Sequence, residues 1–341
     1  MGAAFLRRVS NMTENQIESE EFFSLLEKLM RTPTAPFREH RVRALVLSEV
    51  ARRLRVSVKE DVWGNILVSY FGASSGHDCV LSAHMDHPGF VDGKFLGSMR
   101  PEYLNGGNSV VDCGDGIGVW NLPAFEKCDT WIRGRACDDL VGCSVALATV
   151  FHHARWESRC NAHALLTVAE EVGLLGAALA CDAGTIPRGA TVISVETSPA
   201  LNAQQFHSGC IVRVGDRRSI FSPSVTRDLV NVATGRNIIH RRQLMDGGSC
   251  EGTAFNEAGF NTGALCVALG NAHNQGADQK TESEYVSTSD TIQMLRLAIA
   301  AAESFGTAHE PSPSMTESRI ECAKREFFSH RPAANQKNIS A

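Results

Sequence analysis

Histidine and carboxylate residues follow several short apolar runs of this sequence, where they could bind metal ions or move protons. His84 comes directly after the apolar run 80–83, in the segment Ala83-His-Met-Asp-His-Pro-Gly89. Asp86, two residues further on, could accept the second ring N–H of His84 and raise its basicity as a metal ligand. Taken alone, this segment is equally consistent with a strand that ends in a polar turn.

Two pairs of adjacent carboxylates offer further chemistry. Asp138 and Asp139 open a helical pattern, where the helix dipole favours negative charge, so helix capping alone would account for them. The functional alternative is a carboxylate that bridges two cations. Glu170 and Glu171 follow the apolar run 165–169, and two ionised carboxylates so close together need water or counter-charges. A surface loop would supply water, whereas a metal site would use one Glu as ligand and the other on a bound water.

Acidic or imidazole side chains end four successive predicted strands, because Glu196 follows the run 191–195 and His273 lies shortly after the run 265–269. In a mostly parallel sheet, such strand ends meet at one edge. Carboxylates and imidazoles suit Zn²⁺, with Co²⁺ or Mn²⁺ as alternatives, and five ligands would hold two ions that activate a water between them. Glu170 is then the unligated general base. The predicted ligands are His84, Asp138, Glu171, Glu196 and His273.

The spacing of apolar residues predicts the elements that must position these side chains. Two amphipathic helices come first, one carrying Phe22 to Leu29 and the other Val42 to Leu54. Apolar runs then alternate with helical patterns, which predicts an α/β fold with a mixed, mostly parallel central sheet and helices on both faces. The predicted strands cover 66–70, 80–83, 165–169, 191–195 and 265–269. The helices between and after them cover 140–152, 174–181, 223–234, 253–258 and 288–305.

A glycine-rich stretch, residues 91–133, interrupts this alternation. It holds seven glycines and no helical period, which indicates a short β insert or a long surface loop. Its Gly114-x-Gly116-x-Gly118 run lacks a preceding strand and a βαβ unit, so we interpret it as turn chemistry rather than cofactor binding. The catalytic domain is predicted to cover 13–306, with flexible termini at 1–12 and 307–341.

Composition limits the class of protein. Apolar residues make up 43% of the chain, charged residues 21%, and the net charge is −5, which argues against a nucleic-acid or anionic-membrane partner. The eleven cysteines include no C-x-x-C pair, so they are expected to be reduced, mostly buried thiols rather than a zinc knuckle. The first residues do not fit a signal peptide, and no run of about 18 apolar residues occurs. These features predict a soluble, cytoplasmic protein.

The order of these motifs resembles that of the co-catalytic two-zinc exopeptidases. Within that clan, Glu170-Glu-Val-Gly-Leu-Leu-Gly-Ala177 and Gly134-Arg-Ala-Cys-Asp-Asp-Leu-Val-Gly142 most resemble the glutamyl and deblocking aminopeptidases. Asp61-Val-Trp-Gly-Asn65 is similar to a segment of the same family. The resemblance implies a zinc-exopeptidase-like fold and a metal-dependent aminopeptidase that hydrolyses N-terminal residues of short peptides.

The resemblance also implies a role for each site residue. Glu170 would act as the general base and then return the proton to the leaving amine, while Asp86 would orient His84. Two divalent ions would bind, one held by His84, Asp138 and Glu196 and the other by Asp138, Glu171 and His273.

Some positions depart from the family pattern or leave alternatives open. Glu196 stands where this family usually has Asp, and related carboxypeptidases and deacylases often use Glu. A carboxypeptidase or N-acyl amino acid deacylase is therefore one alternative, and a metal-bound scaffold or binding protein is another. Residues 246–251 are similar to a family segment near the substrate, so Gly247 and Gly248 are candidates for substrate binding. Cys250 stands where that family segment has Asp. His207 could touch substrate or a neighbouring subunit, and the short insert leaves the existence of a homo-oligomer open.

Overall fold

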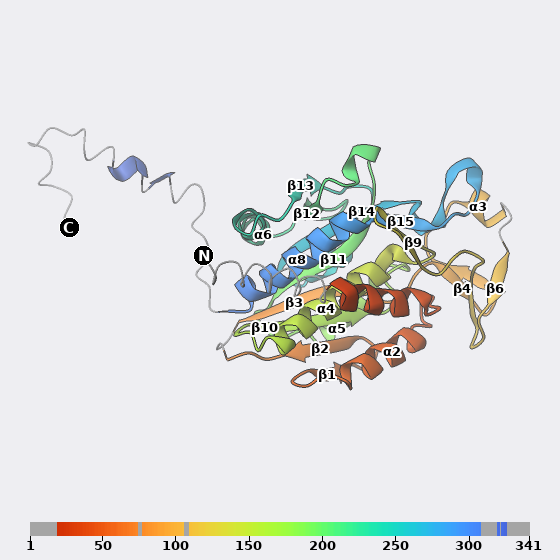
Figure 1. Cartoon of the computed structure of the whole chain (residues 1–341), viewed down its shortest axis with the longest axis horizontal. Helices are drawn as coiled ribbons and strands as arrows, with labels where there is room; N and C mark the ends of the chain where they lie inside the picture. The colour runs from red at the N-terminus through yellow and green to blue at the C-terminus, as the bar shows by residue number, and fades with distance from the viewer. Residues whose placement is uncertain (1–18, 74–76, 106–108, 308–318, 321, 326–341) are drawn as a thin grey trace, which may run out of the picture. The chain divides into compact units, whose positions relative to one another are not determined.

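Figure 1 shows the computed structural model, which describes residues 19–73, 77–105, 109–307, 319–320 and 322–325. The chain divides into two compact units, Met1–Ala308 and His309–Ala341. The first unit contains every predicted site residue, and the described residues of the second are helical. The predicted flexible segment 1–12 lies outside the described residues, as does most of 307–341, so both stay predictions.

An eleven-stranded mixed sheet forms the centre of the first unit, in the order β1-β2-β10-β3-β11-β14-β15-β9-β8, with β12 beside β14 and β13 beside β12. The central neighbours β10, β3, β11 and β14 run parallel, as predicted, whereas β2, β12 and β15 pair with them in the antiparallel sense. The central strands are buried on both faces, which explains their continuous apolar runs. The strand bounds are β1 Ser57–Glu60, β2 Ile66–Tyr70, β3 Asp78–His84, β8 Glu126–Lys127, β9 Trp131–Gly134, β10 Asn161–Thr167, β11 Thr191–Pro199, β12 Cys210–Gly215, β13 His240–Leu244, β14 Asn261–Gly270 and β15 Glu284–Ser287.

Helices cover both faces of this sheet, as the alternating pattern predicts. One face carries α4 and α8, which lie side by side, with α2, α6 and a helix over residues 19–31 packed around them (Figure 1). The other face carries the shorter α5 and α7. The helix bounds are α2 His40–Val50, α4 Cys137–Arg155, α5 Leu175–Asp182, α6 Pro223–Gly235, α7 Glu251–Glu257 and α8 Thr288–Phe305.

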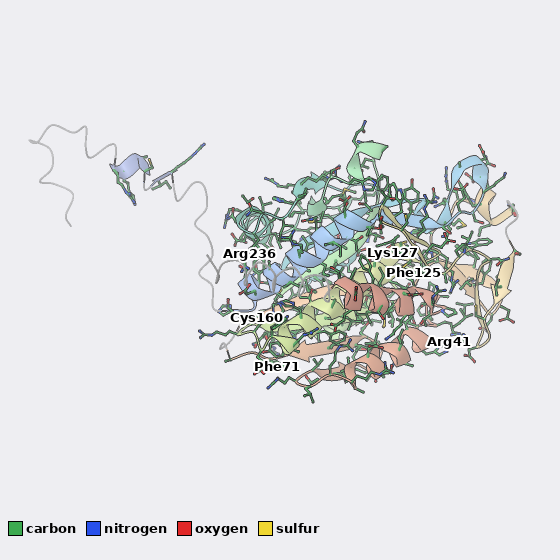
Figure 2. All side chains as sticks on the ribbon, viewed as in Figure 1. Arg41, Phe71, Phe125, Lys127, Cys160 and Arg236 are labelled. Carbon is green, nitrogen blue, oxygen red and sulfur yellow. The ribbon has the colours of Figure 1, made fainter. Side chains whose placement is uncertain are left out.

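Successive residues of the central strands point into two separate cores. In β3, Leu81 and Ala83 join the larger core beneath α4 and α8, whereas Val80 joins the smaller core beneath α5 and α7. Side chains fill the space between the sheet and its helices (Figure 2). Because both faces are packed, the ends of the central strands are held in fixed positions relative to one another.

The glycine-rich stretch contains a separate four-stranded antiparallel sheet in the order β5-β4-β7-β6. Gly114 and Gly116, with φ of +79° and +74°, form the turn between β6 and β7, which agrees with the interpretation of this run as turn chemistry. The stretch also contains a five-residue helix, α3, that the sequence did not predict. The bounds are β4 Gly89–Val91, β5 Lys94–Leu96, α3 Pro101–Asn105, β6 Val110–Asp112 and β7 Ile117–Trp120.

Several predicted boundaries need correction. The second helix ends at Val50 rather than at Leu54, whose side chain is 84% exposed. The strand predicted at 165–169 runs from Asn161 to Thr167, because Ala169, with φ of +52°, has already left the strand conformation. Strands β12 and β13 were missed because arginines interrupt their apolar patterns.

Two further observations concern the cysteines and the helices. All eleven cysteines are free thiols, and most of them are buried, as predicted. Among the described helices, none combines the length and the apolar composition needed to cross a lipid bilayer.

Candidate active site

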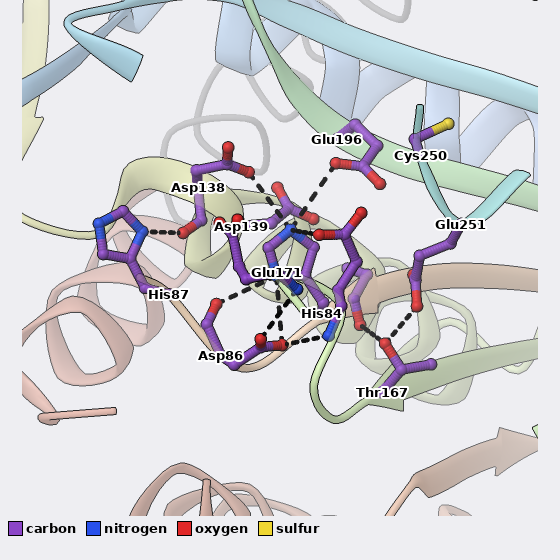
Figure 3. Close-up of polar contacts among 12 residues, drawn as sticks. His84, Asp86, His87, Asp138, Asp139, Thr167, Glu171, Glu196, Cys250 and Glu251 are labelled. Atoms are coloured by element: carbon purple, nitrogen blue, oxygen red, sulfur yellow. Dashed lines mark hydrogen bonds and ion pairs between the residues drawn. The ribbon is translucent and has the colours of Figure 1, made fainter. Parts of the chain in front are cut away.

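The predicted site residues gather at the edge of the sheet where the parallel strands end. His84 is the last residue of β3, and Glu170 and Glu171 lie in the turn after β10. His273 comes shortly after β14, and Asp138 lies in the first turn of α4. In Figure 3, His84 stands among carboxylates that come from several of these segments. Residues far apart in the sequence thus meet at one edge, as the ends of parallel strands must.

Glu196 reaches the same place from within a strand. The expectation that the strand ends before Glu196 is wrong, because β11 continues to Pro199. The Glu196 side chain is nevertheless buried, and its Oε2 lies 3.9 Å from His84 Nε2. The Ser194 hydroxyl donates a hydrogen bond of 3.2 Å to the other carboxylate oxygen.

Asp138 lies between the two imidazoles of the cluster. Its Oδ1 is 3.3 Å from His84 Nε2, and its Oδ2 is 3.7 Å from His273 Nε2. Glu171 Oε2 lies 3.2 Å from the same nitrogen of His273. Possible ligand atoms of His84, Asp138 and Glu171 lie within 4.8 Å of one another, and so do those of His84, Glu170 and Glu196.

The hydrogen bonding of this cluster fits bound cations. His84 Nδ1 donates to the backbone carbonyl of Asp86 at 3.0 Å, and His273 Nδ1 donates to the carbonyl of Ser98 at 2.6 Å, so each Nε2 is directed at carboxylates. Among the described residues, the buried oxygens Asp138 Oδ1 and Glu171 Oε1 have no hydrogen-bond partner. Buried carboxylates without donors, facing imidazole nitrogens, are the donor set of a divalent metal site.

Asp86 contacts both His84 and the turn that carries the two glutamates, although not entirely as the sequence predicts. Its backbone carbonyl, rather than its carboxylate, accepts the hydrogen bond from His84, since carboxylate Oδ1 lies further away, at 3.6 Å. The carboxylate instead accepts the backbone N–H groups of Glu170 and Glu171, at 2.9 and 3.1 Å. Asp86 thereby fixes the turn that carries the two glutamates.

Burial and crowding of negative charge shift the protonation of this site. Burial raises the pKa of Glu170 well above its usual range, and Glu171 and Glu196 raise it further, although His84 opposes them. Burial also raises the pKa of Glu196 to about 8. For His84, burial alone would lower the pKa, but Glu170 and Asp138 hold it well above its usual range. The cluster therefore attracts positive charge, whether a proton or a metal ion.

The sequence analysis did not identify Glu284, the first residue of β15, which binds the backbone of two residues of the cluster. Its side chain is fully buried, with Oε2 accepting the backbone N–H of Asp138 at 3.0 Å and Oε1 accepting that of His273 at 2.7 Å. His87 is buried beside it and donates from Nδ1 to the Asp138 carbonyl at 2.6 Å. Glu284 carries no sequence signal, because it lies in a polar run and its partners are backbone groups.

The small sheet of the insert also contacts the site. Ser98, which follows β5, supplies the carbonyl that accepts the hydrogen bond from His273 Nδ1. Close by, the Tyr103 hydroxyl of α3 donates to the carbonyl of Gly276 at 2.8 Å. The insert therefore orients one of the two imidazoles and braces the loop that carries it.

Cys250 and Glu251 lie to one side of the cluster, at the start of α7 (Figure 3). Burial raises the pKa of the Cys250 thiol, so this residue stays protonated near neutral pH. Glu251 is fully buried and accepts hydroxyl hydrogen bonds from Ser82, at 2.8 Å, and from Thr167. These contacts join α7 to the two strands that carry His84 and the glutamate turn.

The candidate substrate residues lie in two exposed loops. Gly247 and Gly248 are in the loop between β13 and α7, where the Gly248 carbonyl accepts the backbone N–H of Arg217 at 3.0 Å. His207 follows β11 in a loop that crosses near β9 and β15, and it lies within 2.9 Å of the Ser287 hydroxyl. A pocket of about 780 Å³ opens there, lined by residues that include Trp131, Phe206, His207, Asn271, Glu282 and Tyr285.

Residues 108–294, more than half of the chain, match the family model described as M42 glutamyl aminopeptidase, and the chain belongs to this family. The protein is accordingly a metal-dependent aminopeptidase. This finding confirms the predicted resemblance and enzyme class. It favours the aminopeptidase over the carboxypeptidase, deacylase and scaffold alternatives.

Solved structures of aminopeptidases share the fold of nearly the whole first unit. A TET aminopeptidase from a marine sediment archaeon of the Thaumarchaeota matches with a TM-score of 0.72 at 18% identity, over 83% of this chain and 96% of its own. An aminopeptidase from Desulfurococcus kamchatkensis matches with a TM-score of 0.69 at 20% identity, over 84% and 95%. The TET1 peptidase of Pyrococcus horikoshii matches with a TM-score of 0.68 at 19% identity, over 82% and 99%. These likenesses confirm the predicted fold class.

Proposed function

We propose that this enzyme removes N-terminal residues from short peptides at the cluster around Asp138, with two divalent ions per chain. His84, Asp138 and Glu196 would hold one ion, and Asp138, Glu171 and His273 the other. The observation that carries this proposal is the position of Asp138, whose two oxygens each face a different imidazole at 3.3 and 3.7 Å. Zn²⁺ suits this set of carboxylates and imidazoles, with Co²⁺ and Mn²⁺ as alternatives.

The chain's own residues would carry the proton transfers. Two bound ions would polarise the scissile carbonyl and acidify a water. Glu170, whose side chain is 11% exposed at the edge of the cluster, would take the proton from that water and deliver it to the leaving amine. The Asp86 carboxylate would keep Glu170 in position by accepting a hydrogen bond from the Glu170 backbone N–H.

The peptide itself would lie against the exposed loops next to the cluster. We infer that His207 contacts the substrate, because the 780 Å³ pocket that it lines also includes Asn271, two residues before His273. Gly247 and Gly248 would let the peptide backbone approach closely from the loop before α7, since neither carries a side chain.

The proposal also covers the oligomeric state of the protein and its cellular compartment. The Pyrococcus horikoshii TET1 peptidase can assemble into a tetrahedron or a large octahedral shell, and we infer that this chain also forms a homo-oligomer. Eleven free thiols support a reducing compartment, which is consistent with the cytoplasm. Light scattering of the purified protein would test the first inference, because a mass equal to that of one chain would contradict it.

A substrate screen tests the proposed reaction. The full chain would be stripped of metal, reloaded with Zn²⁺, Co²⁺ or Mn²⁺, and assayed on aminoacyl p-nitroanilides of every side-chain class and on matched N-acetylated peptides. We expect turnover of the free-amine substrates and two ions per chain by elemental analysis. Turnover confined to the N-acetylated peptides would instead favour a deacylase.

The substitution Glu170→Gln tests the general base. We expect kcat to fall by about 10²–10⁴-fold, because the amide cannot accept the proton, while the metal content stays at the wild-type value. The matched control is Glu257→Gln on the exposed surface of α7, for which kcat should not change. If Glu170→Gln retained wild-type activity, this mechanism would be wrong although the family assignment would hold.

A further inference from the structure

Glu284 is a carboxylate that binds two backbone N–H groups from different parts of the site. It accepts the N–H of Asp138 with one oxygen and the N–H of His273 with the other, at 3.0 and 2.7 Å. Asp138 and Glu284 are 146 residues apart in the sequence. The side chain is completely buried, so these two contacts are not replaced by water.

The topology explains why one side chain reaches both residues. β15 lies between β14, which leads to His273, and β9, which leads to Asp138, and Glu284 pairs with Gly134 at the end of β9. Glu284 is therefore at the strand end where the two ligand-bearing segments leave the sheet.

The geometry points to Glu284 as a positioning residue that sets the spacing between Asp138 and His273, and so completes the second metal-binding group. This inference rests on the proposed function of the cluster. Asp138 is held from its other side as well, since His87 donates to its carbonyl. The peptide groups around Asp138 are thus bound at both the N–H and the C=O, which fixes the backbone from which its carboxylate extends.

The chemistry of the contact requires a carboxylate rather than any polar side chain of that size. Two converging N–H donors need two acceptors, and a carboxylate supplies both. Glutamine has nearly the same shape, but it offers one acceptor oxygen and turns an NH₂ group toward the second donor. The variant Glu284→Gln therefore keeps the packing of the side chain while breaking one of its two hydrogen bonds.

The test measures metal binding and catalysis in parallel on the full-length protein. Metal-free wild type, Glu284→Gln and the control Glu49→Gln would be titrated with Zn²⁺ by calorimetry and with Co²⁺ by visible absorption. Glu49 on α2 is also buried, but it pairs with Lys28 and Arg53, away from the cluster, so its loss should lower the melting temperature without changing metal affinity. For Glu284→Gln we expect the second ion to bind about 10–100-fold more weakly. We also expect kcat to fall with little change in KM, and to recover when excess metal is added.

Each result of these metal titrations either supports or overturns the role of Glu284. Wild-type affinity for both ions in Glu284→Gln would overturn the inference. If that variant does not fold, Glu284→Asp, which keeps the charge but is one methylene shorter, should show the same loss of the second ion. If neither variant folds while Glu49→Gln does, Glu284 serves folding rather than metal positioning, and the inference fails. If the wild type binds two ions but cleaves no free-amine peptide, the proposed function fails while the role of Glu284 remains measurable by metal affinity.

Discussion

Asp138 joins the two halves of the candidate site. His84 is the last residue of β3 and His273 follows β14, and each faces a different oxygen of the same carboxylate. The position of Asp138 is in turn fixed through its backbone, by Glu284 at the N–H and by His87 at the carbonyl. The backbone of the residue that lies between the two imidazoles is thus held by Glu284 and His87.

At the substrate side, His207→Ala should weaken peptide binding more than turnover. The ring packs on Trp131 with 4.6 Å between centroids and is exposed at the pocket, so its loss removes contact area without touching the cluster. We expect KM for peptides to rise about threefold to tenfold, which corresponds to about 1 kcal/mol, with kcat within a factor of two. Steady-state kinetics checks this, with His77→Ala at the opposite end of β3 as the control. An unchanged KM would remove His207 from the substrate site.

The sequence predicted which side chains meet in the cluster better than it predicted the residues that hold them in place. His84, Glu171 and His273 were predictable because each is a metal-competent side chain near the end of an apolar run. Glu284 was not, because it acts on backbone N–H groups, which every residue except proline possesses. The role of Asp86 was only partly predicted, since its carbonyl and its carboxylate turned out to serve different partners.

Among the elements, the end of β12 is joined to α7 by the carboxylate of Asp216. It accepts the backbone N–H groups of Arg218, Ser219 and Cys250, at 2.8 to 3.0 Å, and the Thr253 hydroxyl at 2.6 Å. Burial would raise the pKa of Asp216, but these four hydrogen bonds lower it below the usual value. The charged carboxylate therefore stabilises the fold at neutral pH.

This arrangement predicts an acid-sensitive contribution to stability. Because the pKa of Asp216 is lower in the folded than in the unfolded chain, the contribution is present above the unfolded pKa of about 3.9 and disappears as the pH falls through the folded pKa. We expect Asp216→Asn to lower the free energy of unfolding at pH 7 by about 1–3 kcal/mol. Urea titrations from pH 7 to pH 3.5 should show this difference narrowing. A constant difference, or an equal effect of Asp182→Asn on the exposed end of α5, would contradict this account.

The elements were predictable where burial produced a clear pattern. The parallel strands β3, β11 and β14 are buried on both faces and read as apolar runs, and α8 was predicted with its observed bounds. β13 was missed because its His-Arg-Arg-Gln-Leu sequence has no apolar alternation. Leu54 misled the prediction of α2, since an exposed leucine can continue a helical spacing after the helix has ended.

For the whole molecule, the cluster should make stability depend on metal. Without cations, the buried carboxylates of Asp138, Glu171 and Glu196 repel one another, and binding to the folded state alone stabilises it by about 4 kcal/mol when the free ion exceeds its dissociation constant 1,000-fold. We expect EDTA to lower the melting temperature by several degrees and Zn²⁺ to restore it, as measured by scanning calorimetry. Asp138→Asn, which lacks the shared ligand, should respond to neither. An equal EDTA effect in that variant would place the stabilising ion elsewhere.

The Ser98 carbonyl makes the orientation of the His273 ring depend on a part of the chain that lies outside the main sheet. Any force that tilts the small sheet, such as a neighbouring copy pressing against it, would be transmitted along that single hydrogen bond to the imidazole. The insert is therefore less free to vary than a peripheral loop would be. A graft that exchanged it for a longer version would have to return an acceptor oxygen to the same point in space, or the enzyme would lose the correct orientation of its last imidazole.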